Sequence, residues 1–347
     1  MNVWFHGGGG HFPTPAGIAE RRAAVIEAMP LVQELGDPAL VFSAAFGGFQ
    51  CATWLAELDE IDRNLAQMVA LAREVERPDF RWIATYTQAD RALLAGDDIR
   101  SELLVEEAYA IGRETEQPGA FTLFAAGMEG VRWHQGRQAE IGDLLAEAAA
   151  KDPNLSILGV GSPAQGAPFA MSDAASDAAS DDDDLARRIR LLPRDQTWLI
   201  SMTVLAEMAA RRGRRAACAA AYEELLPFDG LFAGSTGVLR GAVAHYLGLL
   251  AAAVGSYDAG ARHFADAAAL HERMQAPFHA ARTELEWGRM LLEDRASTST
   301  DLAAQHVERA RQIAAVHHCS QVERRAARLI ETGAAIGPFQ PDPPSVA

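Results

Sequence analysis

Apolar residues recur with a helical period along most of the chain. From about Pro15 onward, large apolar side chains return every three or four positions. No convincing run alternates apolar and polar residues rich in Val, Ile, Thr and aromatics, as a half-buried strand would. Alanine, the strongest helix former, supplies about a fifth of the residues. The pattern predicts an all-α protein.

Turn signals divide the helical pattern into pairs. Glycine or proline punctuation recurs at intervals of roughly 35 to 41 residues, the range of helical-pair repeats, at Gly36-Asp37-Pro38, Arg77-Pro78-Asp79, Gln117-Pro118-Gly119 and Asp152-Pro153-Asn154. A second set of glycines, at Gly96, Gly136, Gly213 and Gly255, splits segments into two helices each. One unit of two antiparallel helices is therefore predicted to repeat.

The clearest unit ends at Pro277 and resembles a tetratricopeptide repeat with a longer second helix. Leu247, Gly248, Tyr257, Phe264 and Ala267 occupy the relative positions at which such repeats place large and small residues. A single unit cannot bury its apolar face, so neighbouring pairs must stack on it. We therefore predict a tetratricopeptide-like α-solenoid of stacked antiparallel helix pairs.

The helical pattern fails in the middle of the chain and at both ends. We predict a flexible N-terminal segment (1–14), a front array (15–158), an acidic low-complexity linker (159–184), a back array (185–335) and a disordered tail (336–347). If the arrays are independent, fragments 15–158 and 185–335 should each melt cooperatively.

Charge and cysteine usage narrow the class of protein. The formal net charge is -16 with a pI near 5.0, which argues against nucleic-acid binding by the chain alone and against anionic membrane surfaces. Cys51, Cys218 and Cys319 are odd in number and far apart, so no disulfide framework is expected. The N-terminus has no leader pattern, and no stretch of about 18 residues is apolar enough to span a bilayer. A cytoplasmic location is predicted.

The sequence contains no complete motif of the common enzyme classes. Lys151 lacks the glycine loop of a nucleotide-binding site, and the glycines between His6 and His11 lack the serine elbow that an esterase needs. No two histidines are four apart, and the acidic run Asp181 to Asp184 is typical of a solvated charge run or helix start. We therefore predict no catalytic residues, no cofactor and no metal: the chain is not expected to be an enzyme.

A few residues are candidates for recognition or packing. Arginines cluster at 187–188, 211–215 and 324–325, where helix-end charges and surface ion pairs are the expected role. Trp198, His245, Tyr246 and Trp287 are candidate groove or packing residues, with packing between helices preferred.

The segment from about Pro193 to Leu292 resembles the C-terminal tetratricopeptide-like region of actinobacterial multidomain P-loop ATPase regulators. Those proteins join an ATPase module and helical repeats to a LuxR-type DNA-binding domain or a class III adenylate cyclase domain. This chain carries neither the ATPase signatures nor a terminal helix-turn-helix after Ile330, nor a cyclase segment. The resemblance therefore implies a regulator's sensor arm that is either free-standing or separated from its effector domains.

The predicted function is a non-catalytic helical-repeat scaffold for protein-protein interaction or signal sensing. Its expected partner is a protein, such as an ATPase or the output domain of a transcriptional regulator. The alternative is a small-molecule sensor that binds a ligand between helices, using Trp198, His245, Tyr246 and Trp287. An enzyme on a helical scaffold is the third hypothesis.

Overall fold

A computed structural model describes residues 14–151, 178–195, 197–294 and 300–332. The first half forms the helices α2 (Pro15–Leu35), α3 (Pro38–Leu55), α4 (Leu58–Glu74), α5 (Pro78–Leu94), α6 (Asp98–Glu114), α7 (Ala120–Gln135), η1 (Gln138–Ile141) and α8 (Gly142–Lys151). The second half forms α9 (Ala178–Arg190), α10 (Trp198–Arg211), α11 (Arg215–Leu225), η3 (Leu226–Phe228), β1 (Phe232–Ser235), β2 (Val238–Ala242), α12 (Val243–Val254), α13 (Tyr257–Arg273), α14 (Pro277–Glu293), α15 (Thr300–Val316) and α16 (Ser320–Thr332). The structure confirms a mostly helical protein.

The predicted turn signals begin and end these helices. Proline stands at the first position of α2, α3, α5 and α14, where its missing N–H costs nothing. Asp37 accepts a hydrogen bond from the Ala39 N–H at the start of α3. Gly36 has a φ of 66° after α2, a left-handed conformation in which glycine carries no steric penalty. Local sequence therefore fixes many helix boundaries.

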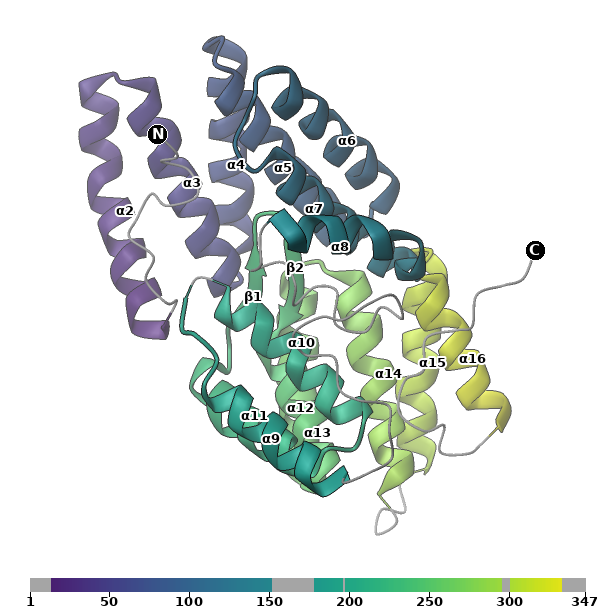
Figure 1. The fold of residues 1–347 in the computed structure, drawn as a ribbon. Helices are drawn as coiled ribbons and strands as arrows, with labels where there is room; N and C mark the ends of the chain where they lie inside the picture. Colours follow the sequence, from purple (N-terminus) through teal and green to yellow (C-terminus); the bar gives the residue numbers. More distant parts are fainter. Residues whose placement is uncertain (1–13, 152–177, 196, 295–299, 333–347) are drawn as a thin grey trace.

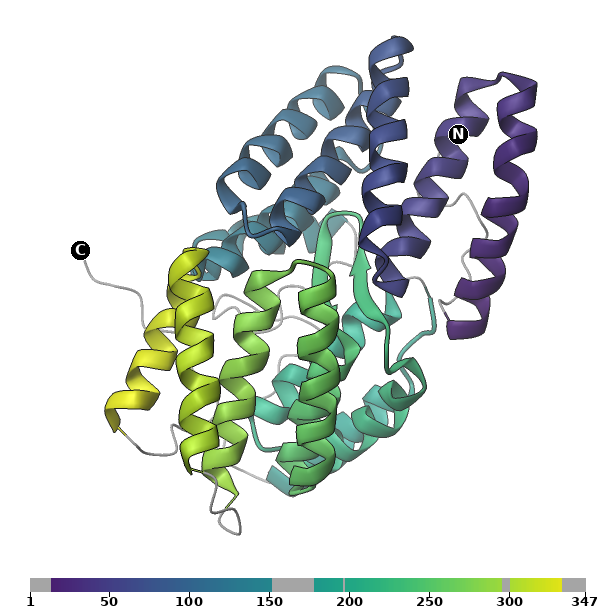
Figure 2. The same ribbon diagram turned by 180° about the vertical axis from the view of Figure 1, so that it is seen from behind.

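Successive helices of the first half pack against one another in two layers (Figure 1). Helices α3, α5 and α7 contact the hairpin of β1 and β2, while α2, α4 and α6 pack on them from the other side. Helices α10, α12, α13 and α14 contact the same hairpin from the second half, as the view from behind also shows (Figure 2). The hairpin thus lies between the two halves.

A two-stranded hairpin, which the sequence did not predict, accompanies the helices of a fold that is consistent with the all-α class. Its strands pair antiparallel, from Phe232 opposite Ala242 to Ser235 opposite Val238. All but one of the strand residues are buried, so the sequence shows no alternation of apolar and polar positions. The strands are also short, at four and five residues. Periodicity cannot separate such runs from the start of a buried helix.

The hydrophobic core crosses the predicted boundary between the front and back arrays. One cluster joins Cys51 and Trp54 to Trp198 and Val238, and another joins Phe42 to Phe232. Stacking on a shared core is what covers the inner faces of α3 and α5.

The acidic run belongs in part to a helix. Helix α9 begins at Ala178, inside the predicted linker 159–184. The predicted end of the linker at residue 184 therefore lies several residues after the start of the helix. The Asp182 carboxylate accepts hydrogen bonds from the backbone N–H groups of Ala216 and Ala217 at the start of α11. A carboxylate there meets the positive end of the helix dipole. The rest of the predicted linker, residues 1–13 with the His6 to His11 segment, and the predicted tail lie outside the described residues.

Helix α3 bears on the expectation that no stretch is apolar enough to span a bilayer. Among the described residues it is the one helix that passes by length and composition, with a mean hydropathy of 1.2. Half of its residues are buried inside the protein, as is typical of a core helix. Phe42, Phe46, Phe49 and Trp54 are the large apolar side chains of α3 that this packing buries.

We expect one cooperative unfolding transition for the intact chain, because the hairpin and both halves share a core. Fragments cut in the linker, 15–158 and 185–335, should lack cooperative melting when each is alone, since each loses part of that core. Circular dichroism melts of the chain and both fragments check this. Two well-separated transitions in the intact chain would show that the halves fold independently.

Candidate functional site

Both halves of the protein hold the hairpin by directed hydrogen bonds. From the first half, Trp54 Nε1 donates to the Gly234 carbonyl at 2.8 Å, and the Gly237 N–H lies 3.1 Å from both Asp90 carboxyl oxygens. From the second half, the Tyr246 hydroxyl donates to the Arg240 carbonyl at 2.6 Å. The hairpin tip and the middle of β2 are therefore held by different halves.

Asp90 is a buried carboxyl at the tip of the hairpin. Burial raises its pKa to about 8, although the hydrogen bond from Gly237 acts in the opposite direction. The group is therefore largely protonated at neutral pH and avoids placing an unpaired charge in the core. A cavity of about 10 Å³ lies beside it, lined also by Trp54 and Thr236, and has the size of a single water.

A β-bulge aims Arg240 into a buried group of charges. Pairing shifts between Ala233–Gly241 and Gly234–Leu239, which leaves Arg240 as the extra residue on β2. Its guanidinium lies 3.5 Å from Glu129 on α7 and 3.5 Å from Glu207 on α10. These side chains are almost wholly buried. Arg240 thus bridges the two halves of the molecule through the hairpin.

Arg282 and Trp133 complete this charged centre. Arg282 on α14 lies 2.6 Å from Glu207, and Arg211 also pairs with that carboxylate. The Trp133 ring faces two guanidinium groups, with the Cζ of Arg240 at 4.0 Å from its centroid and that of Arg282 at 4.5 Å. Arginine stacks well on an aromatic face because its delocalised cation is weakly hydrated.

The two carboxylates of the charged centre differ in pKa. Burial opposes ionisation of Glu207, but Arg211, Arg282 and Arg240 outweigh it and lower its pKa to about 2. Burial raises the pKa of Glu129, which Arg240 only partly counters. Glu129 Oε2 and Arg240 Nε are buried without a hydrogen-bond partner in the described protein. Buried pairs of this kind add little net stability, so the centre specifies how the halves fit rather than how tightly they hold.

Four buried histidines surround the charged centre and form the histidine cluster: His134, His245, His271 and His279. Burial, together with Arg282, lowers the pKa of His134 and of His245 to about 3. Burial and the neighbouring cluster members lower the pKa values of His271 and His279 well below the usual range. All four rings are therefore neutral in the folded protein near pH 7.

One backbone group fixes the proton positions in part of the histidine cluster. The Ala242 N–H donates to His271 Nε2 at 2.8 Å, so that nitrogen must carry a lone pair. The proton of His271 then sits on Nδ1, 3.2 Å from the Thr283 hydroxyl, which itself lies 2.9 Å from His245 Nδ1. A chain of hydrogen bonds therefore runs from the end of the hairpin to α12. Protonating His271 at Nε2 breaks its first link.

The sequence-predicted residues lie in the core of the second half. Trp198 packs on Phe228, Tyr246 is fully buried, and His245 lies edge-on to the Tyr246 ring at 5.1 Å. Trp287 is partly buried and stacks on His306 with ring centroids 4.0 Å apart. All four make packing contacts. The arginine clusters also make ion pairs, but Arg325 pairs with the buried Glu286 at 2.7 Å rather than at the surface.

An open groove lies on the outer layer of the first half. We call it the outer groove; α2 and α4 form its walls, α3 forms its floor, and its volume is about 450 Å³. The lining residues are Arg22, Val25, Ile26, Met29, Pro30 and Gln33 of α2, Gly48 and Ala52 of α3, and Glu57, Glu60, Arg63, Asn64 and Gln67 at α4. One wall is therefore largely apolar, and the other is polar and charged.

Two features of α2 make the outer groove a suitable binding surface. Ile26 lines it with 62% of its surface exposed, a large unburied area for a β-branched side chain. Pro30 stands inside α2 and has no N–H to donate to the Ile26 carbonyl four residues earlier. Across the groove, the ion pairs Arg22–Glu57 and Arg63–Glu60, at 2.9 and 2.8 Å, supply charges of both signs.

A second groove lies one helix pair further along the same layer. It has a volume of about 570 Å³ between α4 and α6, and Arg73, Glu76, Arg81 and Glu107 make it more polar. On α5 its residues Arg81 and Thr85 lie on the opposite side of the helix from Asp90, which faces the hairpin. The two grooves therefore open away from the hairpin.

Sequence reasoning missed the charged centre and the outer groove, although the sequence carries a signal for each of them. Glu129, Glu207 and Arg240 are single charges within apolar runs, a pattern that indicates a buried ion pair. Helix α2 carries large apolar residues on more than one face: Ile18, Val25 and Met29 share one face, whereas Ile26, Leu31 and Leu35 lie off that face and are mostly exposed.

Replacing Gly241 by alanine should destabilise the protein by about 3 kcal/mol. Gly241 has a φ of 96°, and an added Cβ lies 2.8 Å from His279 Nδ1 and 3.0 Å from His271 Nε2. Gly213→Ala is the matched control, because its φ is 63° and nothing lies within 4 Å of the added Cβ. That control should cost about 1 kcal/mol. Urea unfolding measures both; equal losses would mean that the histidines impose no packing constraint.

Stability should fall steeply as the pH drops below 6.5. The histidine cluster stays neutral when folded but binds protons near pH 6.5 when unfolded, so each ring removes about 1.4 kcal/mol of stability per pH unit below that pH. For His134 and His245 this loss continues down to about pH 3. Asp90 and Glu129, with raised pKa values, act in the opposite direction. A net loss of about 3 kcal/mol per pH unit is expected between pH 6 and about 5.

The variant His134→Phe isolates one of these groups. The phenylalanine ring can take the place of the His134 ring, which stacks on Phe278 with centroids 3.8 Å apart. The variant should lower the pH dependence of the unfolding free energy by about 1.4 kcal/mol per pH unit. His317→Gln, at an exposed position, is the control and should leave the slope unchanged. Urea unfolding at several pH values gives the slopes. An unchanged slope in His134→Phe would contradict a neutral buried His134.

No protein-family model, no curated protein and no solved structure matches this chain. Its function is therefore inferred from its own geometry.

Proposed function

We propose that this protein is a non-catalytic helical-repeat scaffold that binds a segment of a partner protein in the outer groove. The helix pairs form a tetratricopeptide-like solenoid in this proposal, with the hairpin as an insertion on its inner side. The observation that carries the proposal is the exposed Ile26 in an open groove of about 450 Å³ beside a charged wall.

The inner side of the helices is a less favourable place for a partner. Helical repeats commonly use their concave surface for binding. Here α3, α5 and α7 face the chain's own hairpin, whose strand residues are almost all buried against both halves. The outer groove is open to solvent, and most of its lining residues are at least partly exposed, so it is ready for a ligand without rearrangement.

The lining defines the chemistry of the partner segment. Val25, Ile26 and Met29 suit one or two apolar anchor side chains, as in helix-in-groove recognition. Methionine adapts its shape to different anchors. Glu60 and Arg63 on the facing wall suit charged residues on either side of the anchors. An amphipathic segment of a protein meets these requirements better than a uniformly charged polymer does.

The resemblance to regulators of the ATPase and cyclase classes supports a signalling role in the cytoplasm. In this proposal the partner is an ATPase or the output domain of a transcriptional regulator, and binding biases its activity. The alternative, a small-molecule sensor, would place its ligand among Trp198, His245, Tyr246 and Trp287. Those side chains pack against protein groups, which favours the outer groove as the binding surface.

The variant Ile26→Asp should weaken partner binding at least tenfold, a loss of about 1.4 kcal/mol. Peptides are selected from a displayed random library on the wild-type protein, with subtraction on Ile26→Asp, and their affinities are then measured by fluorescence anisotropy. We expect selected sequences to carry apolar anchors at helical spacing with flanking charges.

Ile99→Asp is the matched control. Ile99 lies on α6 with 71% of its surface exposed, outside both grooves, so its substitution makes the same chemical change without touching them. Circular dichroism verifies that both variants remain folded. Equal loss of peptide binding in both variants, or selected peptides that bind Ile26→Asp as tightly as the wild type, would reject the outer groove.

A further inference from the structure

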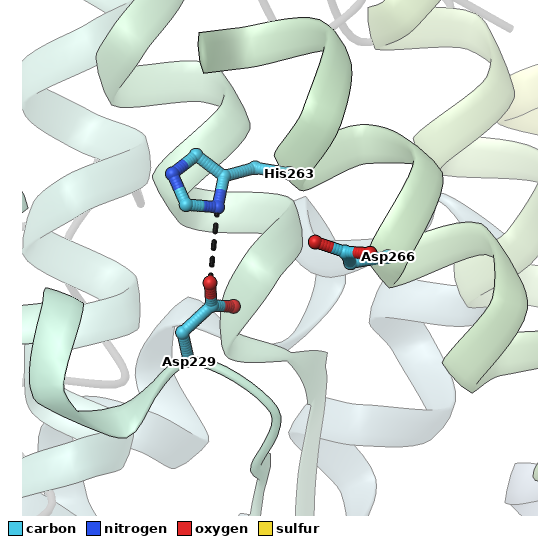
Figure 3. Close-up of side chains that lie close together, drawn as sticks. All are labelled: Asp229, His263 and Asp266. Atoms are coloured by element: carbon cyan, nitrogen blue, oxygen red, sulfur yellow. Dashed lines mark ion pairs between the residues drawn. The ribbon is translucent and has the colours of Figure 1, made fainter.

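Three side chains of metal-binding type meet where the chain leaves η3 and approaches β1 (Figure 3). Asp229 follows η3, and His263 and Asp266 lie on α13. One ligand atom from each residue lies within 4.8 Å of the other two. His263 Nδ1 points toward Asp229 and is 3.2 Å from its Oδ2.

Local structure positions each of these groups. His263 and Asp266 are three residues apart on α13 and therefore share a face of the helix. Asp229 Oδ1 accepts a hydrogen bond from the Gly230 N–H at 3.1 Å, which orients the carboxylate. The Tyr222 hydroxyl lies 3.0 Å from His263 Nε2 and holds the imidazole ring. The arrangement is typical of a ligand histidine supported by an outer hydrogen bond.

The His263 ring supplies a second, independent observation. This residue is only 8% exposed, and its Nδ1 is buried without a hydrogen-bond partner, since its contact with Asp229 lacks hydrogen-bond geometry. A buried ring nitrogen without a partner is costly. A cation between Nδ1 and the two carboxylates satisfies it, and the Nε2 proton then lies toward the Tyr222 oxygen.

The charge of the cluster also favours a cation. Asp229 and Asp266 bring two carboxylates to one histidine. Within the part of the chain that the structure describes, no arginine or lysine forms an ion pair with either aspartate. Their charges are therefore not neutralised by a basic side chain, in contrast to Glu207 and Glu286, which arginines surround.

We propose that Asp229, His263 and Asp266 bind a divalent transition-metal ion, with zinc as the best match. One imidazole nitrogen and two carboxylate oxygens suit Zn²⁺ better than Ca²⁺, which takes oxygen ligands. Both aspartates are exposed, so their side chains can rotate to close the remaining distance, and water completes the coordination. The i, i+3 spacing escapes a search for histidines four apart, and Asp229 is distant in sequence.

The site goes beyond the proposed partner binding and lies on the other half of the molecule. A bound ion links the segment that leads into β1 with α13, two parts of the chain that the contact between Asp229 and His263 already brings together. Since binding to the folded state stabilises it, metal should strengthen the attachment of the hairpin.

Isothermal titration of the full chain with Zn²⁺, after treatment with a chelator and dialysis, tests the proposal. We expect saturable binding of one ion per chain. Asp266→Asn and His263→Gln should each weaken it at least tenfold. Co²⁺ is a second probe, and its visible absorption bands should report a nitrogen and oxygen ligand set in the wild type and be lost in Asp266→Asn.

Asp258→Asn is the matched control, because it removes the same charge from an exposed position on the same helix. It should leave affinity and the Co²⁺ spectrum unchanged. Circular dichroism confirms folding, and the exposed Asp266 makes its variant the safer test if His263→Gln unfolds. No saturable binding, or binding that survives Asp266→Asn, would overturn the proposal, the latter by placing the ion elsewhere.

Discussion

Arg240 is a buried charge that carboxylates from both halves of the molecule approach. Its side chain lies between Glu129 of the first half and Glu207 of the second, and its backbone belongs to the hairpin that both halves enclose. An arginine cannot shed its proton to escape burial, so its environment has to supply negative charge. Glu207 does so with a pKa near 2, and Trp133 covers the guanidinium. The relative placement of the halves follows from this requirement.

Specificity rather than strength explains so many charges and histidines in one core. A wholly apolar contact between the halves would tolerate sliding, because hydrophobic burial has no preferred direction. Ion pairs and hydrogen bonds with fixed geometry tolerate little sliding of the halves. A displaced hairpin would leave Arg240 and His271 without partners. The charged centre and the histidine cluster thus determine how the two halves align when they assemble. Their orphaned atoms, such as Glu129 Oε2, are a cost in stability that accompanies this arrangement.

Sequence reasoning predicted the features that depend on local chemistry. Helix boundaries follow from residues such as Gly36 and Pro277, because caps and proline act within a few residues. The hairpin escaped because its strand residues are almost uniformly buried. Contacts such as Trp54 with Gly234, 180 residues apart, depend on how the halves dock. The candidate binding residues escaped for another reason: an exposed Ile26 and a buried isoleucine look alike in a helical pattern, and only packing distinguishes them.

The hairpin also changes how any other molecule competes for the inner side of the helices. Because it is tethered at both ends, its effective concentration there is on the order of millimolar. A free segment at micromolar concentration thus faces a disadvantage of about a thousandfold, or about 4 kcal/mol, before any difference in contacts counts. Trp54, Asp90 and Tyr246 add hydrogen bonds that a competitor would have to replace. The chain's own hairpin therefore occupies the inner side of the helices, and the proposed binding groove between α2 and α4 lies on the opposite face.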